Sequence, residues 1–373
     1  MNSCKAAFSQ STVAAEGEIR VGIVWDGRDV HSVKIDSTRP HIAGRVLAGQ
    51  HARAAAKTVP LLFSICRRSQ AIASALACES AQGMEPTADQ LLARARAITM
   101  EMVEEYSWRA LIDWPHALGE PANPRALADI RRALDAGSDE VPAAACALVE
   151  QHVFGTAAER LLAQDLHRFD RWLRRGDSPA ARLLVAVRDA QPSLGASEVA
   201  LMPCSRRDAL LRDVGAAVGH DENFARTPQW NGQPAETGAL ARLCQDTFVS
   251  ELVKRFGRTT LARFAARLRE LAALLTEATT PALGGLALGP GRGLGWVENA
   301  RGLLVHYVAL DGERIETYRI VAPTEWNFHP RGALARGLEA TLAESESDLK
   351  RRAMLLVQSL DPCVAANVEV RHA

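Results

Sequence analysis

Apolar and polar residues alternate in two stretches of the chain, one close to its start and one in its last fifth. From about residue 18 to 36 the apolar positions recur every second residue on both sides of Asp26-Gly27, and from about 303 to 322 they do so around Asp311-Gly312. Alternation around an Asp-Gly pair is typical of a β-hairpin. We therefore predict two hairpins, which could share one small sheet.

The sequence between the hairpins, from about residue 40 to 280, has a helical pattern, with Ala, Leu, Arg and Glu recurring at 3.6-residue spacing. Thr87 and Gln90 predict a capping box that opens a helix reaching about Glu105, and Pro124 fits the first turn of another. A loop is expected at about 220–237, and the glycines from Gly284 to Gly295 predict a break. Further helices are expected over these ranges: 142–172, 246–278 and 334–360.

These elements predict a mainly α member of the α+β class. We expect one domain over residues 1–373, because the pattern offers no point of division. Its parts are the N-terminal hairpin at about 18–36, the helical middle at about 40–280, the second hairpin at about 303–322, and a C-terminal helix with its tail over 334–373.

The composition is that of an ordinary globular protein, with 47% hydrophobic and 24% charged residues among 373. Lys+Arg and Asp+Glu balance at 44 each, so no overall field favours nucleic acid. No run approaches about 18 apolar residues and the start lacks the order of a signal peptide. We expect a cytoplasmic protein without a membrane span. Its seven cysteines are scattered, which argues against disulfides and a closed zinc site.

Five segments share one order and rough spacing with a known family. They are Arg39-Pro40 with the glycine-containing stretch after it, Cys66 at the head of an Ala-rich helix, Glu298-Asn299-Ala300-Arg301-Gly302, Pro323-Thr324-Glu325-Trp326-Asn327 continuing to Arg331, and Asp361-Pro362-Cys363. Together they resemble the large subunit of nickel–iron hydrogenases, over essentially the whole chain. The resemblance implies that family's fold.

The chain departs from the family at the metal ligands. Where the family has a CxxC pair near each end, Phe63 and Ala366 replace one cysteine of each pair. Gln70 and Glu369 occupy the positions of the histidines that normally follow. One thiolate of each pair is therefore kept, and the sequence ends shortly after Cys363, so we expect no extension for a maturation protease to remove.

The resemblance implies a role for each retained residue. Cys66 is similar to a thiolate that bridges nickel and iron, and Cys363 to a terminal nickel thiolate. Arg301 and Thr324, which follows Pro323, resemble the residues that contact the cyanide ligands of iron. Two thiolates suit an iron that brings its own CO and cyanides, whereas they make a poor nickel site.

Among relatives of the hydrogenases this pattern is similar to accessory proteins of the HupK/HoxV type. The resemblance implies a non-enzymatic scaffold that binds Fe(CN)2CO through Cys66 and Cys363. It would receive the unit from a HypC-type chaperone and a HypD-type maturation protein and pass it to the hydrogenase large subunit. A docking protein with a vestigial site is the alternative, and an active hydrogenase is a third, less favoured one.

Each residue also has a plainer interpretation. Cys66 could be a small core residue, although a helix N-terminus beside Arg67 and Arg68 favours a thiolate. Cys363 could belong to a turn that ends a helix, Arg301 to the surface and Thr324 to a strand end. Further candidates for a minor role are listed here: Glu16, Cys4, His306 and His329. We expect structural roles for the remaining cysteines, at positions 4, 78, 146, 204 and 244.

Overall fold

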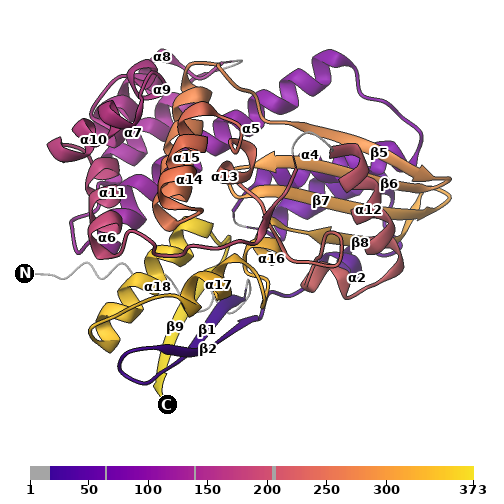
Figure 1. Ribbon diagram of the computed structural model, residues 1–373. Coiled ribbons are helices and arrows are strands. Elements are labelled where there is room, and N and C mark those ends of the chain that lie inside the picture. The colour runs from indigo at the N-terminus through magenta and orange to yellow at the C-terminus, as the bar shows by residue number, and fades with distance from the viewer. Residues whose placement is uncertain (1–16, 64, 138–139, 204–206) are drawn as a thin grey trace, which may run out of the picture.

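The computed structural model describes residues 17–63, 65–137, 140–203 and 207–373. A body of helices lies on one side, a four-stranded sheet lies on the other, and a three-stranded sheet with two helices lies below them (Figure 1). This arrangement confirms the predicted class, α+β with mainly α structure.

The helical body is centred on α15 (Thr260–Leu275), in which every residue except Arg269 is buried. A helix buried on all sides needs other elements around it. Those that make up the rest of the body are α5 (Ala88–Trp108), α6 (Trp114–Ala117), α7 (Pro124–Asp135), α8 (Ala143–Val149), α9 (Ala158–Leu162), α10 (Leu166–Arg175), α11 (Pro179–Ala190), α13 (Ala239–Arg242) and α14 (Thr247–Phe256), with the π-helical turns η2 (Arg109–Asp113) and η3 (Glu150–Phe154).

Two of the predicted helix starts are confirmed. Thr87 and Gln90 form a reciprocal capping box before α5, and Pro124 occupies the first turn of α7. The predicted ends were less accurate, because the three long helices are each divided. Gly155 and Gly257 adopt φ of 65° and 79° and end one helical segment each, and Ser345 caps a new helix. The 3.6-residue hydrophobic pattern continues on both sides of each break, because the helical segments on both sides pack against a core.

The four-stranded sheet is antiparallel, in the order β5-β6-β7-β8, and packs against α4 (Arg67–Ala81) (Figure 1). Its strands are β5 (Leu283–Gly289), β6 (Arg292–Asn299), β7 (Gly302–Asp311) and β8 (Arg314–Val321). The pairing of β7 with β8 confirms the second hairpin. The predicted break in the helical pattern at 284–295 is confirmed, but the segment forms strands β5 and β6, which were not predicted. Glycine is required there because a Cβ on Gly295 would lie 2.1 Å from the Ala73 carbonyl oxygen of α4.

The three-stranded sheet has the order β2-β1-β9. The hairpin of β1 (Glu18–Trp25) and β2 (Val30–Ser37) is antiparallel, as predicted. The expectation that both hairpins share a sheet is wrong: β1 pairs instead with β9 (Ala365–His372), a strand not predicted, in parallel and with Ile19 opposite Ala366. This pairing places the first described strand beside the last one, directly after Cys363.

The remaining elements surround the meeting point of these parts. The loop expected at 220–237 holds only a 3₁₀ turn and a two-residue strand. No helix among the described residues has the length and apolar character needed to cross a membrane. The remaining elements are α2 (Ala43–Leu47), α3 (Ala52–Thr58), η1 (Val59–Leu61), β3 (Ala200–Leu201), α12 (Arg207–His220), η4 (Phe224–Arg226), β4 (Ala235–Glu236), α16 (Pro323–Asn327), α17 (Ala333–Glu339) and α18 (Glu346–Leu360).

Candidate metal-binding site

Cys66 stands at the N-terminal end of α4 in a left-handed conformation, with φ 58° and ψ 35°. Non-glycine residues rarely adopt this conformation, and it costs about 1 kcal/mol. The thiol makes no capping hydrogen bond to the helix. The Glu101 carboxylate instead accepts from the backbone N–H groups of Arg68 and Ser69. The Cys66 side chain, which is 6% exposed, is thus left to face the interior in front of the helix.

Arg301 lies in the turn between β6 and β7 and reaches Cys66 from a point 235 residues later in the chain. Its Nη1 donates to Cys66 Sγ at 2.9 Å, and its Nη2 donates to Glu105 at 2.8 Å. The arginine is 2% exposed. The turn has a close fit, since Gly302 has φ 131° and a Cβ there would lie 2.5 Å from the Thr237 side chain. A charged donor is thereby held against a buried sulfur.

Burial raises the pKa of the Cys66 thiol well above its ordinary value, and the guanidinium of Arg301 opposes that rise. The cationic neighbour is therefore Arg301. The expectation that Arg67 and Arg68 supply it is wrong, because both side chains are exposed. Without a metal the protonated thiol is favoured.

Cys363 follows α18 in the segment that leads into β9. Asp361 ends the helix with φ 56°, and Arg109 holds this turn through the Asp361 carboxylate at 2.7 Å and the Pro362 carbonyl at 2.9 Å. The Thr324 hydroxyl, at the start of α16, accepts from Cys363 N at 3.2 Å and donates to Cys363 Sγ at 3.0 Å. Each cysteine therefore has one donor directed at its sulfur.

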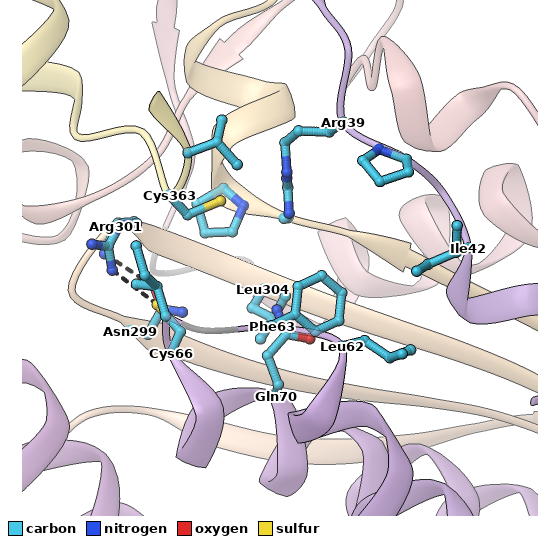
Figure 2. Close-up of a pocket in the computed structure, with 15 residues that line it drawn as sticks. Arg39, Ile42, Leu62, Phe63, Cys66, Gln70, Asn299, Arg301, Leu304 and Cys363 are labelled. Carbon is cyan, nitrogen blue, oxygen red and sulfur yellow. Dashed lines mark hydrogen bonds between the residues drawn. The ribbon is translucent and has the colours of Figure 1, made fainter. Parts of the chain in front are cut away.

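Both cysteines line one cavity of about 40 Å³, shown in Figure 2. The Arg39 guanidinium projects into the same space from the segment before α2 and pairs with Glu325 at 2.6 Å, with both side chains buried. A larger cavity of about 440 Å³ adjoins the first, and Arg39, Phe63 and Ala322 line both. The other residues that line the small cavity are Pro40, Ile42, Leu62, Ile65, Gln70, Asn299, Arg301, Leu304, Pro323 and Val364.

The structure brings together the residues predicted from the sequence. Cys66, Cys363, Arg301 and Pro323 line the small cavity, and Thr324 reaches Cys363 from behind it. Arg301 and Thr324 are buried, so neither is the surface or strand-end residue of the plainer interpretation. Phe63 also faces the cavity, whereas Ala366 lies in β9 opposite Ile19 and packs against a different core.

The minor candidates lie elsewhere. Cys4 and Glu16, like Cys204, fall outside the described residues. His306 is hydrogen-bonded to Tyr318 and Gln70, and His329 to the backbone of Arg331. Cys78 is buried and Cys146 half-buried, but Cys244 is exposed, so a core role is wrong for it. In the part of the chain that the structure describes, no group of three or more His, Cys, Asp or Glu side chains is arranged to hold a metal ion.

Sequence reasoning missed three residues that shape the site. Arg39 belonged to a matched segment, but its partner Glu325 is 286 positions away. Asn299 lies within a matched segment and Gln70 stands where the family has a histidine. Neither was given a role, yet both line the cavity. Their signal in the sequence was slight, since an amide side chain next to a motif is common in proteins.

Known proteins resemble the chain in sequence and in fold. A family model described as "Nickel-dependent hydrogenase" matches residues 286–369. The hydrogenase expression/formation protein HoxV of Cupriavidus necator is 33% identical, over 90% of this chain and 92% of its own. The hydrogenase expression/formation protein HupK of Rhizobium leguminosarum is 29% identical, over 92% and 93%. A crystal structure of the reduced, active Ni-Fe-Se hydrogenase from Desulfomicrobium baculatum shares the fold, with a TM-score of 0.60 at 16% identity over 91% of this chain and 95% of that one.

Proposed function

The chain belongs to the family of hydrogenase expression/formation proteins that includes HoxV and HupK, and from that premise we propose that it is a non-enzymatic scaffold for the iron part of the nickel–iron centre. Membership of this family gives it a role in hydrogenase maturation. The proposed cargo is Fe(CN)2CO, bound through Cys66 and Cys363 and then passed to the hydrogenase large subunit.

One observation carries the proposal: each cysteine that lines the cavity has its own buried donor. Arg301 donates to Cys66 Sγ and Thr324 to Cys363 Sγ, although the two donors lie 23 positions apart and belong to different elements. A donor near a sulfur stabilises the thiolate that iron needs. The same donors are of the kind that iron-bound cyanide, a hydrogen-bond acceptor, requires in a dry pocket.

The number of thiols suits a cargo that arrives with its own ligands. Iron in Fe(CN)2CO already carries three diatomic ligands, so two sulfurs complete a five-coordinate centre. Each thiol loses its proton to solvent as its S–Fe bond forms, the bonds that held iron to the donor protein break in exchange, and no electron is transferred. Release is the reverse: thiolates of the acceptor form bonds to iron while Cys66 and Cys363 leave and take up protons.

The pocket also contains a second cation that can balance the charge of two thiolates. Iron(II) with two cyanides is neutral, so the bound site has two negative sulfurs. Proximity to Cys363, Glu325 and Cys66 raises the pKa of Arg39, which therefore stays charged beside them. Buried charges are tolerated when they are paired. Arg39, which also pairs with Glu325, and Arg301, which also pairs with Glu105, place two cations beside these sulfurs.

The proposed partners are a HypC-type chaperone and a HypD-type maturation protein as donors, and the hydrogenase large subunit as acceptor. We propose that the exchange takes place in the cytoplasm. The larger cavity beside the site gives the cargo a path that does not require the helical body to open.

Infrared spectroscopy of the intact protein tests the proposal. The protein is co-expressed with the maturation factors without oxygen and purified, and its CO and cyanide stretching bands are recorded. We expect these bands in the wild type and in Cys244→Ser, whose exposed thiol is the matched control, and none in Cys66→Ala/Cys363→Ala.

Two results would contradict the scaffold role. One is a wild-type protein without the bands, and the other is a double variant that keeps them. If the double variant also supports full hydrogenase maturation in cells, the chain acts as a docking protein and its cysteines are dispensable. Stoichiometric nickel with hydrogen uptake would indicate an enzyme instead.

A further inference from the structure

Two uncharged amides line the cavity beside the cysteines and have no part in the function described so far. Asn299 comes from the end of β6 and Gln70 from the first turn of α4, and they are 2% and 4% exposed. Figure 2 shows Asn299 next to Cys66, and Gln70 extending from the helix beside Phe63. An amide has one end that accepts and one that donates, so its orientation decides what it offers to a ligand.

The backbone fixes the orientation of Asn299. Its Oδ1 accepts from Arg301 N at 3.0 Å and from Gly302 N at 3.2 Å. The opposite orientation would place the amino group against two N–H donors. The carbonyl end must therefore face the turn, and the amino end is the one available to the cavity.

A chain of hydrogen bonds orients Gln70. Its Oε1 lies 2.9 Å from His306 Nε2, and His306 Nδ1 lies 2.7 Å from the Tyr318 hydroxyl. Burial lowers the pKa of His306 to about 3, so its ring is neutral and carries one N–H. With Gln70 Oε1 accepting from the ring, that N–H is at Nε2 and Tyr318 donates to Nδ1. His306 and Tyr318 thus position Gln70 with its amino end toward the cavity.

Within the described residues, neither amino group has a hydrogen-bond acceptor. Both amino groups are therefore available to a ligand that carries an acceptor. The apolar residues of the wall, such as Phe63 and Leu304, offer none. An acceptor carried by the cargo would satisfy both groups.

We propose that the amino groups of Asn299 and Gln70 donate hydrogen bonds to the cyanide nitrogens of the iron unit and so select a cyanide-bearing iron over a bare metal ion. This inference rests on the proposed function. The amides add donors without adding charge to a pocket that already contains two guanidinium groups paired with carboxylates, those of Arg39 and Arg301.

Isosteric acid variants test the inference while keeping the folded contacts. Asn299→Asp still accepts from the backbone of Arg301 and Gly302, and Gln70→Glu still accepts from His306. Each replaces only the donating end by an acceptor. Asn123→Asp is the matched control, because Asn123 Oδ1 accepts from Ala126 N at the start of α7, outside the cavity.

Each protein is co-expressed with the maturation factors and its infrared bands are measured per molecule, with circular dichroism as the check of folding. We expect the occupancy of folded Asn299→Asp and Gln70→Glu to fall about tenfold or more, since a donor to an anionic ligand is lost and an anion replaces it. In the loaded fraction the cyanide bands should shift more than the CO band. Asn123→Asp should match the wild type.

The outcomes separate the two proposals. Bands in the wild type together with unchanged occupancy and unchanged band positions in both folded acid variants would overturn the role of the amides and leave the scaffold role intact. A wild type without bands would overturn both. Lower occupancy in Asn299→Asp and Gln70→Glu, together with wild-type occupancy in Asn123→Asp, supports the inference.

Discussion

The two cysteines of the site occupy very different surroundings, although the sequence presents them as equivalent halves of two pairs. Cys66 is buried, stands at the end of a helix packed on a sheet, and is paired with a guanidinium. Cys363 is half-buried, lies in a connecting segment, and is paired with a hydroxyl. One sulfur is thus enclosed in a rigid part of the fold, and the other is accessible beside it.

The difference suggests a division of work between the two sulfurs. In the proposed scaffold, an enclosed thiol whose pKa is raised by burial would need Arg301 to stabilise its thiolate before it could bind iron. An accessible thiol can meet an incoming or outgoing partner more readily. We infer that Cys363 is the first sulfur to engage and that Cys66 secures the cargo. The predictions below test this contrast.

The largest effect is expected from Arg301→Met, which removes the cation on the Cys66 side. Breaking a buried ion pair leaves an uncompensated charge, and Glu105 and Asp361 both face Arg301. Because Glu105 is partly exposed, we expect a loss of about 3 kcal/mol in the free energy of unfolding. Urea denaturation measures it. Arg171→Met, at an exposed position, should change the value by less than about 0.5 kcal/mol, and equal values for the two variants would refute the importance of this pairing.

The next effect concerns access to the two thiols. We expect iodoacetamide to modify Cys363 on the order of 100-fold faster than Cys66, because alkylation needs an exposed thiolate. Peptide mass spectrometry after timed labelling gives both rates. Exposed Cys244 and buried Cys78 provide the fast and slow references. Equal rates at Cys66 and Cys363 would remove the contrast between them.

Sequence reasoning predicted most of what local chemistry controls. The capping box at Thr87, the Asp-Gly hairpins and the ordered motifs all act over a few residues, or were matched as segments. The pairing of β1 with β9 could not be predicted, because a parallel contact between distant strands leaves no local pattern. Nor could the glycines of β5 and β6 be recognised as packing positions, since their role depends on how closely α4 approaches.

The sequence identified residues that the structure brings together at one cavity, but not the difference between the surroundings of the two cysteines. Nothing next to Cys66 indicated that Arg301 would replace Arg67 and Arg68 as the cation. Phe63 and Ala366 also appeared equivalent as substituted cysteines, yet Phe63 lines the cavity and Ala366 lies in a strand. Which arginine lies beside Cys66 and which substituted position lines the cavity both depend on contacts between residues far apart in the sequence.

A smaller effect is expected in the dependence of stability on pH. Burial raises the pKa of Cys66 in the folded protein above its ordinary value of 9.0, so the thiol ionises first in the unfolded chain. The Cys66 thiol makes its full contribution to the free energy of unfolding below pH 9.0. That contribution falls as the pH rises toward the pKa of the folded state, by up to about 1.4 kcal/mol per pH unit. Burial also raises the pKa values of Cys78, Tyr106 and Tyr318, so the measurement is the difference between wild type and Cys66→Ala in urea denaturation from pH 8 to 10. We expect the variant to lose less stability over this range, and parallel curves would contradict the assignment.

The smallest effect is expected on the Cys363 side, from Thr324→Val. This change keeps the shape of the side chain and removes the hydroxyl that contacts both the backbone and the sulfur of Cys363. A neutral hydrogen bond contributes about 1 kcal/mol, so we expect a loss of about that size, well below that of Arg301→Met. Because the backbone N–H of Cys363 stays in Cys363→Ala, a double-mutant cycle in urea denaturation separates the two contacts. A coupling energy near zero would mean that the hydroxyl serves only the backbone, and the donor on this sulfur would then matter only when iron is bound.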